Sequence, residues 1–496
     1  MPDMNGLLLI AALASVIVAL LYTWVVGRHY RWRVFGQPKP ADLLPRKRHR
    51  VLKSLVIIVS VIFVIVFILV TIPAVLGLIN KDLPAVNDAD LVLSKLNIPN
   101  EQNGFFQVVE VASTTFAMMD PTDAGKVRDI VDGRIWDSDA AARVLANNQN
   151  ALNALVEGAQ KPYFQAPNTM DPETYGYTAI LTYLNTTRLA GQYYALDALY
   201  LAHSGREQEA FDTALAGVAV GSKLVSSQGS LIHHFVGLSV EQMDLNAIRL
   251  IIASSSTSTV ILKQIAERLK GYVDDGSGLQ KTLRFDYHGM KNTINQLAHG
   301  DADAADEFGG LVKATQEIDR TSFFFHPNQT IQDAADYKRK IIEIARLGCG
   351  PSQEKGEKIA EQDRYLVAYK QSATNPLSLY LKPNAIGRLL NSIIFVSLSS
   401  AVEKHCKYNV LVAATRLTAG LKAYSIEHKG QLPGSLDELV PTYLSDMPLD
   451  PFSSQPFKYN PEKKIIYSVG ESKKDVGGST TGTWDHMESP TFSVAF

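Results

Sequence analysis

The chain has 496 residues, 46% of them hydrophobic, and a formal net charge of −2. This length leaves room for two or three domains. One short segment, residues 27–53, contains nine Lys and Arg and a single Asp; the rest of the chain then has 39 basic and 49 acidic residues, a net charge of −10. An acidic chain of this kind argues against nucleic acid as a partner.

Two long apolar runs, Leu7–Val26 and Leu55–Ile79, contain no charged residue. At about 1.5 Å per helical residue, each is long enough to cross a hydrocarbon core of roughly 30 Å. The basic segment 27–53 lies between them, and cytoplasmic loops collect Lys and Arg. The pattern predicts a transmembrane hairpin over residues 1–81, with a cytoplasmic loop, both chain ends outside and the lipid bilayer as a partner.

A cleaved signal peptide is the alternative for the first run. Such a peptide needs a basic start and a shorter apolar core, whereas residues 1–3 contain no base and Trp24 and Arg28 follow the apolar residues. We therefore expect a retained helix. The predicted location is the inner membrane, as a multi-pass protein with a large extracytoplasmic domain.

Residues 82–380 have the pattern of an irregular α-helical domain. Phe211, Leu215, Val218 and Val225 repeat at helical spacing. Two helices over 193–204 and 207–226 are expected to form a hairpin at Gly205. No 34-residue self-repeat is present, so a regular tetratricopeptide array is not predicted.

From residue 381 to the end, the pattern predicts a small α+β domain. A long helix is expected to end near Glu427, before Lys429 and Gly430. Ser435 and Glu438 have the spacing of a capping box and open a short helix. Short strands are expected over 457–459, 465–469 and 491–495. The fold class is therefore mainly α, with a two-helix anchor, a helical domain and this tail.

Several blocks of the tail match a known family in order. They are the run 424–441 (YSIEHKGQLPGSLDELVP), Tyr443-Leu444, the PLDPF of 448–452 and the IYSVG of 466–470. These blocks resemble the C-terminal domain of the type II secretion major pseudopilin, general secretion pathway protein G. The resemblance implies a long helix, an aspartate–proline loop, a small antiparallel sheet and a calcium-binding loop.

The calcium loop that the resemblance implies has three candidate ligands, Glu471, Asp475 and Asp485. Calcium takes six or more oxygen ligands, several of them carboxylates. Ser472 stands where the family has an aspartate, so a solvated glycine-rich loop without metal is the alternative. Calcium is the one cofactor that the sequence suggests.

The N-terminus departs from the pseudopilin pattern. Gly6 is followed by Leu7 rather than phenylalanine, and the apolar run after it contains no glutamate. Processing by prepilin peptidase is therefore not expected. The segments 147–167 and 375–390 also resemble membrane-anchored bacterial proteins that carry this tail and have no assigned activity.

Catalytic motifs are absent from the sequence: it contains no HExxH, GxSxG or GKS motif. His233 and His234, with Glu241 two turns further on, could indicate a metal site, but adjacent histidines point in different directions on a helix, so only one of them could serve with Glu241. Packed or capping histidines are the favoured interpretation. Cys349 and Cys406 are either a disulfide or two buried thiols.

These observations predict a structural or assembly protein of the bacterial envelope rather than an enzyme. We expect it to be associated with a type II secretion or pilus-like system and to have an envelope protein as its partner. The alternative is a helical module at the envelope surface that binds a peptide or protein. An envelope hydrolase is a third hypothesis, and a convergent cluster of carboxylates or histidines would favour it.

Overall fold

The computed structural model describes residues 54, 58–68, 71, 81–117, 119–176, 182–254, 257–300, 323–350, 383–394, 399–478 and 488–496. The chain divides into two compact units. The first consists of Met1–Asp82, Glu317–His326 and Lys382–Asn384, and the second of Leu83–Gln316, Pro327–Leu381 and Ala385–Phe496. The second, called the large unit below, contains both the predicted helical domain and the tail. The boundary predicted at residues 380 and 381 lies outside the described residues.

The predicted membrane anchor is not supported. Among the helices of the described ranges, none is both long enough and apolar enough to cross a bilayer. This finding contradicts the transmembrane hairpin and the multi-pass inner-membrane location. The first apolar run and the basic segment 27–53 lie outside the described residues.

The large unit is mainly helical. Its described α-helices are, in chain order, α3 (Ala112–Thr115), α4 (Pro121–Val131), α5 (Ser138–Asn147), α6 (Gln149–Gln160), α7 (Tyr183–His203), α8 (Glu207–Ser226), α9 (Leu231–Ser254), α10 (Thr259–Lys270), α11 (Ser277–Ala298), α14 (Pro327–Arg346), α17 (Ala385–Ile394) and α18 (Ser399–Glu427). Shorter turns are η1 (Asn100–Gln102), η2 (Phe106–Val111), η3 (Pro167–Thr169) and η4 (Leu436–Leu439).

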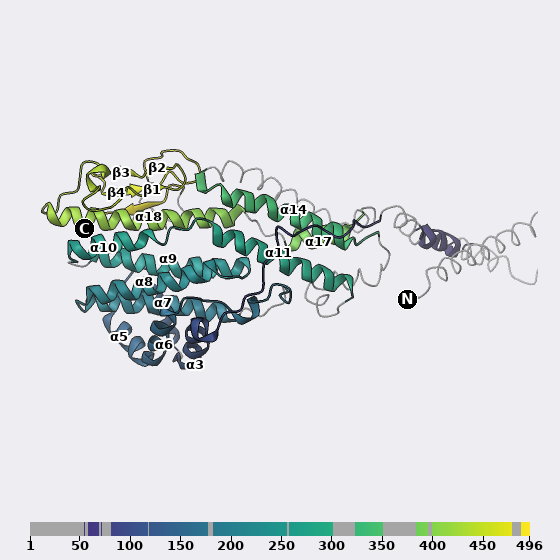
Figure 1. The fold of residues 1–496 in the computed structure, drawn as a ribbon, viewed down its shortest axis with the longest axis horizontal. Coiled ribbons are helices and arrows are strands. Elements are labelled where there is room, and N and C mark those ends of the chain that lie inside the picture. Colours follow the sequence, from purple (N-terminus) through teal and green to yellow (C-terminus); the bar gives the residue numbers. More distant parts are fainter. Residues whose placement is uncertain are drawn as a thin grey trace, which may run out of the picture. The chain divides into compact units, whose positions relative to one another are not determined.

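Three helices, α7, α8 and α9, form the centre of the large unit, and each contacts the other two (Figure 1). The predicted hairpin of α7 and α8 is present. Gly205 makes its turn with a φ of +77°, in the left-handed region that glycine adopts without strain. Small buried residues such as Ala198 and Ala214 let the two backbones approach closely.

Helix α9 is covered on several sides, because α7, α8, α11 and α18 all contact it. Its sequence is accordingly apolar around most of its circumference, which is typical of a buried helix. The long helix α18 also packs along α10, and α11 packs against α14. Lys338 of α14 and Asp286 of α11 form an ion pair of 3.1 Å with both side chains buried.

The long helix of the predicted C-terminal domain, α18, ends at Glu427, as predicted. From here on, the tail means the part of the chain that follows α18. A capping box of Ser435 and Glu438 opens η4, which is a 3-10 helix. β1 (Leu449–Asp450) pairs with β2 (Gln455–Pro456) in an antiparallel hairpin. A second antiparallel sheet has the order β3 (Lys458–Asn460), β4 (Ile465–Tyr467) and β5 (Thr491–Ser493). The three predicted strands are thus present, each within one or two residues.

Candidate functional site

Polar side chains gather inside the large unit, around α9, where burial would favour apolar residues. Four of them belong to α9 itself: His233, His234, Glu241 and Asp244. Residues of the turn between α10 and α11, and of α18, extend this group. Clusters of buried ionisable groups are candidate functional sites, because enzymes and switches both use perturbed pKa values. We call this group the polar cluster.

His233 has two hydrogen-bond partners within the core. Its Nδ1 lies 2.7 Å from the Tyr183 hydroxyl and its Nε2 lies 2.7 Å from the Ser227 hydroxyl. Burial lowers the pKa of His233 to about 3, and the neighbouring His234 contributes in the same direction. The ring is therefore neutral at physiological pH and acts as a hydrogen-bonding core residue.

His234 points toward a different part of the core. Its Nδ1 lies 3.3 Å from the carbonyl oxygen of Val225, and its Nε2 is buried without a hydrogen-bond partner. Burial lowers the pKa of His234 to about 4, although the carboxylate of Asp274 opposes this. The two adjacent histidines thus have separate surroundings, as expected for neighbours on a helix.

Glu241 and Asp244 lie three residues apart on the side of α9 that faces α8. Opposite them α8 has Gly221 and Gly217. A Cβ atom on Gly217 would overlap the carboxyl group of Asp244, and one on Gly221 would lie 2.6 Å from Cγ of Glu241. Only glycine therefore lets these two helices approach with the acids between them. We call these four residues the glycine seam.

The acids of the glycine seam are fully enclosed: Asp244 is 0% exposed and Glu241 is 1% exposed. Burial raises the pKa of both carboxyl groups well above the usual range. For Glu241 the hydroxyls of Tyr408 and Ser222 act in the opposite direction, but burial outweighs them. Burial therefore favours the protonated, neutral form of both side chains.

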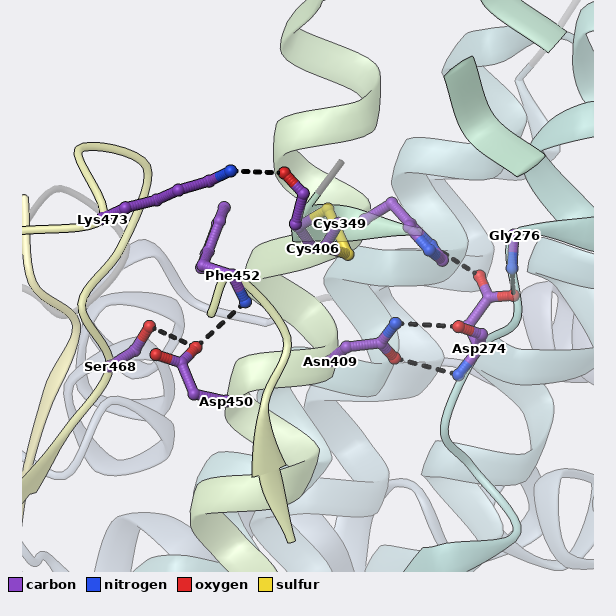
Figure 2. Close-up of a disulfide and its surroundings, with 11 residues drawn as sticks. Asp274, Gly276, Cys349, Cys406, Asn409, Asp450, Phe452, Ser468 and Lys473 are labelled. Carbon is purple, nitrogen blue, oxygen red and sulfur yellow. Dashed lines mark hydrogen bonds and ion pairs between the residues drawn. A yellow bond between two sulfur atoms is a disulfide. The ribbon is translucent and has the colours of Figure 1, made fainter. Parts of the chain in front are cut away.

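The turn between α10 and α11 is tied to α18 by Asp274 (Figure 2). Its backbone N–H donates to Oδ1 of Asn409 at 2.9 Å, and Nδ2 of Asn409 donates to its carbonyl oxygen at 2.8 Å. Its carboxylate lies 3.0 Å from Nδ1 of His405 and accepts the N–H of Gly276 at 2.9 Å. Burial acts to raise the pKa of Asp274, but His405, the N–H of Gly276 and His234 together outweigh it, and the pKa is lowered.

Gly276 is fixed by this network. Its φ is +81°, and a Cβ there would lie 2.9 Å from the carbonyl oxygen of Ala345. A side chain would be strained by both the backbone angle and the contact. Gly276 therefore allows the turn to lie against the end of α14.

Cys349 and Cys406 form a disulfide, which decides between the two alternatives left by the sequence. Their Cα atoms are 5.4 Å apart, a usual separation for such a bond. The bond joins the chain just after α14 to α18, one residue from His405. Beside it, Nζ of Lys473 donates to the carbonyl oxygen of Gly350 at 2.7 Å, so the tail meets the same point (Figure 2).

Asp450, in the aspartate–proline loop of the tail, is a buried structural acid (Figure 2). It accepts hydrogen bonds from Ser468 Oγ at 2.8 Å, Val469 N at 2.9 Å and Phe452 N at 3.1 Å. These bonds join β1 to the end of β4. The carboxylate of Asp450 thus links the two sheets through side-chain hydrogen bonds instead of backbone hydrogen bonds between strands.

The predicted calcium ligands lie as follows. Asp475 accepts the Tyr467 hydroxyl at 2.9 Å and lies 3.5 Å from Nζ of Lys458. Glu471 lies 3.8 Å from Nζ of Lys407. Asp485 is outside the described residues. Among the residues that the structure describes, no three His, Cys, Asp or Glu side chains are grouped as metal ligands, and the calcium site stays a prediction.

Glu471 also meets a second acid, Glu403 of α18. Burial raises the pKa of Glu471 to about 7, and a hydrogen bond to Glu403 acts in the same direction. Lys407 lies 2.6 Å from Glu403, so the two carboxyl groups share one cation. This contact attaches the tail loop to α18.

Most of the polar cluster could not be predicted from the sequence. The sequence indicates His233, His234 and Glu241, but neither Asp244 nor the pair of Asp274 and His405. A signal for the glycine seam exists in the sequence: Gly217 and Gly221 have the four-residue spacing of close helix packing. No local signal connects Asp274 with His405, which are 131 residues apart.

The polar cluster can hold protons and fix helix positions, and its groups are closed to solvent. General acid–base catalysis needs a group within hydrogen-bond reach of a substrate, and the members on α9 are buried between packed helices. The site therefore has the chemistry of a buried structural network with ionisable members.

Comparison with known proteins gave no relative: no protein-family model, no curated protein and no solved structure matches the chain. The resemblance of the tail to the pseudopilin domain accordingly stays a prediction from its sequence blocks.

Proposed function

We propose that this protein is a structural or assembly protein, in which a helical body holds the tail in a fixed position for a protein partner. The observation that carries the proposal is the attachment of the tail to several helices at once. Ser445 Oγ donates to Glu267 of α10 at 2.6 Å, and Arg249 of α9 stacks over the Phe492 ring at 4.7 Å.

The main ionic attachment is between α18 and the tail. Arg416 lies 2.8 Å from Asp446, which also lies 3.0 Å from Lys270 of α10. Each of these contacts restricts the tail relative to a different helix. These restraints hold the tail in one orientation, as expected for a segment that a protein partner must bind.

The enclosed polar cluster also favours a structural role over catalysis. If Asp274 and His405 formed an acid–base pair of a hydrolase, a substrate would have to reach a group that is buried between α18 and the α10–α11 turn. In a structural protein the same pair has a direct use, because it fixes that turn on α18.

Photo-crosslinking in cells of the source organism tests the proposal. A photoreactive residue at the exposed position Val476 of the tail and another at the exposed position Val156 of α6 sample the two parts of the large unit. The assembly role predicts one discrete protein adduct at Val476. An adduct confined to Val156 would favour a binding module in the helical body, and absence of adducts at both positions would contradict a role in assembly.

A companion variant separates the structural role from the hydrolase. Asp274→Asn keeps the size of the side chain and removes its charge. If the variant retains its far-ultraviolet circular dichroism, we expect an unchanged crosslinking pattern. If the variant no longer supports the protein's role in cells although its crosslinks are unchanged, the hydrolase is favoured.

A further inference from the structure

The two acids of the glycine seam are incompletely partnered: the hydroxyls of Tyr408 and Ser222 reach Glu241, whereas no group reaches Asp244. Neither Asp244 oxygen has a hydrogen-bond partner, and neither does Oε2 of Glu241. Burying an ionised carboxylate without partners is far more costly than burying the neutral acid. The folded protein therefore favours the protonated form of both side chains.

No cation compensates either acid within the described part of the chain. The ionisable and charged groups that face the seam come from each packed element: Tyr194 from α7, Asp274 from the α10–α11 turn, Tyr408 from α18, and His234 and Arg249 from α9 itself. Asp274 is an acid and would repel a second negative charge. Arg249 stacks over Phe492 instead, and the Tyr194 hydroxyl donates to the carbonyl oxygen of Leu155.

The remaining neighbours do not supply a counter-charge. From α4, the carbonyl oxygen of Val131 accepts from Asn246 of α9 at 3.0 Å. From α11, Asp286 accepts the N–H of Leu231 at 3.2 Å and pairs with Lys338 of α14. From α8, the seam is lined by glycine backbone rather than by charged side chains.

The close approach of the helices also removes space for water. A Cβ on Gly221 would lie 2.8 Å from both the backbone nitrogen of Glu241 and the carbonyl oxygen of Gly237. At Gly217 the Asp244 carboxyl group occupies the space of a missing methyl group. An ionised acid could gain solvation here only if α8 and α9 moved apart.

We propose that the α8–α9 contact is a proton-dependent joint, in which the two helices pack closely while Asp244 and Glu241 hold protons and separate when these acids ionise. The species that this contact binds and releases is the proton. The proposal is independent of the function proposed above, since it concerns the packing of the helical body alone.

The sign of the pH dependence follows from the protonation states. In the unfolded chain both acids ionise near pH 4, while in the folded protein they keep their protons to a higher pH. The folded state therefore binds more protons, and its equilibrium constant falls by up to tenfold per pH unit for each retained proton. The contribution of the two acids to stability therefore falls as the pH rises above about 4, and continues to fall until the folded protein releases the protons. The buried histidines His233 and His234 act in the opposite direction below about pH 7, because the unfolded chain takes up their protons near pH 6.5 while the folded protein keeps both rings neutral. The effect of the acids is therefore measured above that range.

Equilibrium unfolding of the full chain in urea between pH 6 and 9 tests the proposal. We expect the folding constant of the wild-type protein to fall with pH, by up to a hundredfold per unit while both acids are protonated. Asp244→Asn and Glu241→Gln keep the shape of the neutral acids, and each should remove up to a tenfold change per unit. Asp212→Asn, on the exposed side of the same helix α8, is the matched control and should leave the slope unchanged.

Hydrogen exchange on the wild-type protein gives a second readout that needs no variant. Protection factors of amides in α8 and α9 should fall between pH 6 and 9, ahead of those in α11 and α14. Equal pH slopes for wild type and for the foldable variants would overturn the proposal. So would protection in α8 and α9 that stays constant over this range.

Discussion

Arg416 of α18 and Asp446 of the tail form an ion pair of 2.8 Å in which the arginine side chain is 4% exposed and the aspartate 43% exposed. Nε of Arg416 also donates to the carbonyl oxygen of Ala266 in α10 at 3.1 Å. One guanidinium thus joins α10, α18 and the tail. The hydrogen bond to Arg416 lowers the pKa of Asp446 to about 2.

Replacement of Asp446 should destabilise the protein in a pH-dependent way. Asp446→Asn should lower the free energy of unfolding by about 1 kcal/mol at pH 7, since the carboxylate is partly screened by water. The pKa of Asp446 is depressed, so its contribution is present above about pH 4 and is lost as the pH falls toward 2. Urea unfolding at pH 7 and pH 3 measures both effects. The control is Asp212→Asn, which breaks the exposed pair of Arg268 and Asp212 and should lower the free energy of unfolding by less. An equal loss in both variants would contradict a special contribution of the buried Arg416.

Removal of the disulfide should cost more than removal of any single ion pair. Cys349 and Cys406 are 57 positions apart, and closing a loop of that length in the unfolded chain is worth about 4 kcal/mol in the chain-entropy model. We expect the double variant Cys349→Ala/Cys406→Ala to lose about 2–4 kcal/mol of unfolding free energy. Its melt should be insensitive to reductant, whereas the wild-type melt should fall when reductant is added. A wild-type melt that reductant leaves unchanged would contradict the bond or its contribution.

His233 should make the protein sensitive to acid. Its pKa lies at about 3 in the folded state because of burial, against 6.5 for a free histidine. The unfolded chain therefore takes up the proton first, and stability falls as the pH drops below about 6.5. His233→Gln should cost about 1–3 kcal/mol at pH 7 by removing hydrogen bonds, and should flatten the decline between pH 6.5 and pH 4. His299→Gln, at an exposed position, should follow the wild-type curve; the prediction fails if His233→Gln does so as well.

Calcium should stabilise the tail if Glu471, Asp475 and Asp485 bind it together. A ligand that binds only the folded protein adds about 2.7 kcal/mol at a hundredfold excess over its dissociation constant, which raises the melting temperature by a few degrees in a chain of this size. Thermal melts in millimolar calcium and in chelator measure the shift, with magnesium as the control ion. Asp475→Asn should abolish it, because few carboxylates remain for a doubly charged ion. Equal melting temperatures with calcium and with chelator would contradict the calcium site and leave the description of the fold unchanged.

The tail could be predicted well because its signals are local. The end of α18 is marked by Lys429 and Gly430, and η4 by the Ser435–Glu438 capping box, each within a few residues of the feature. The membrane anchor was wrong: the length of an apolar run is a local signal, and among the described residues no helix is long and apolar enough to cross a bilayer.

The polar cluster could not be derived in the same way. Asp274 and His405 meet only because α18 packs along α10, and no residue near either one indicates that packing. Glu241 and Asp244 in an otherwise apolar stretch were a partial signal, since burial of acids needs an explanation. Their relationship to Gly217 and Gly221 required the register of α8 against α9, which depends on the tertiary structure.

The disulfide has a consequence for chain cleavage. Every peptide bond between Cys349 and Cys406 belongs to one covalent ring, closed by the two sulfur atoms. A protease that cuts a single bond in this ring opens it but releases no fragment. The nicked protein would migrate as one species under non-reducing conditions and as two after reduction, and the piece that contains α18 and the tail would stay attached to the piece that contains α14.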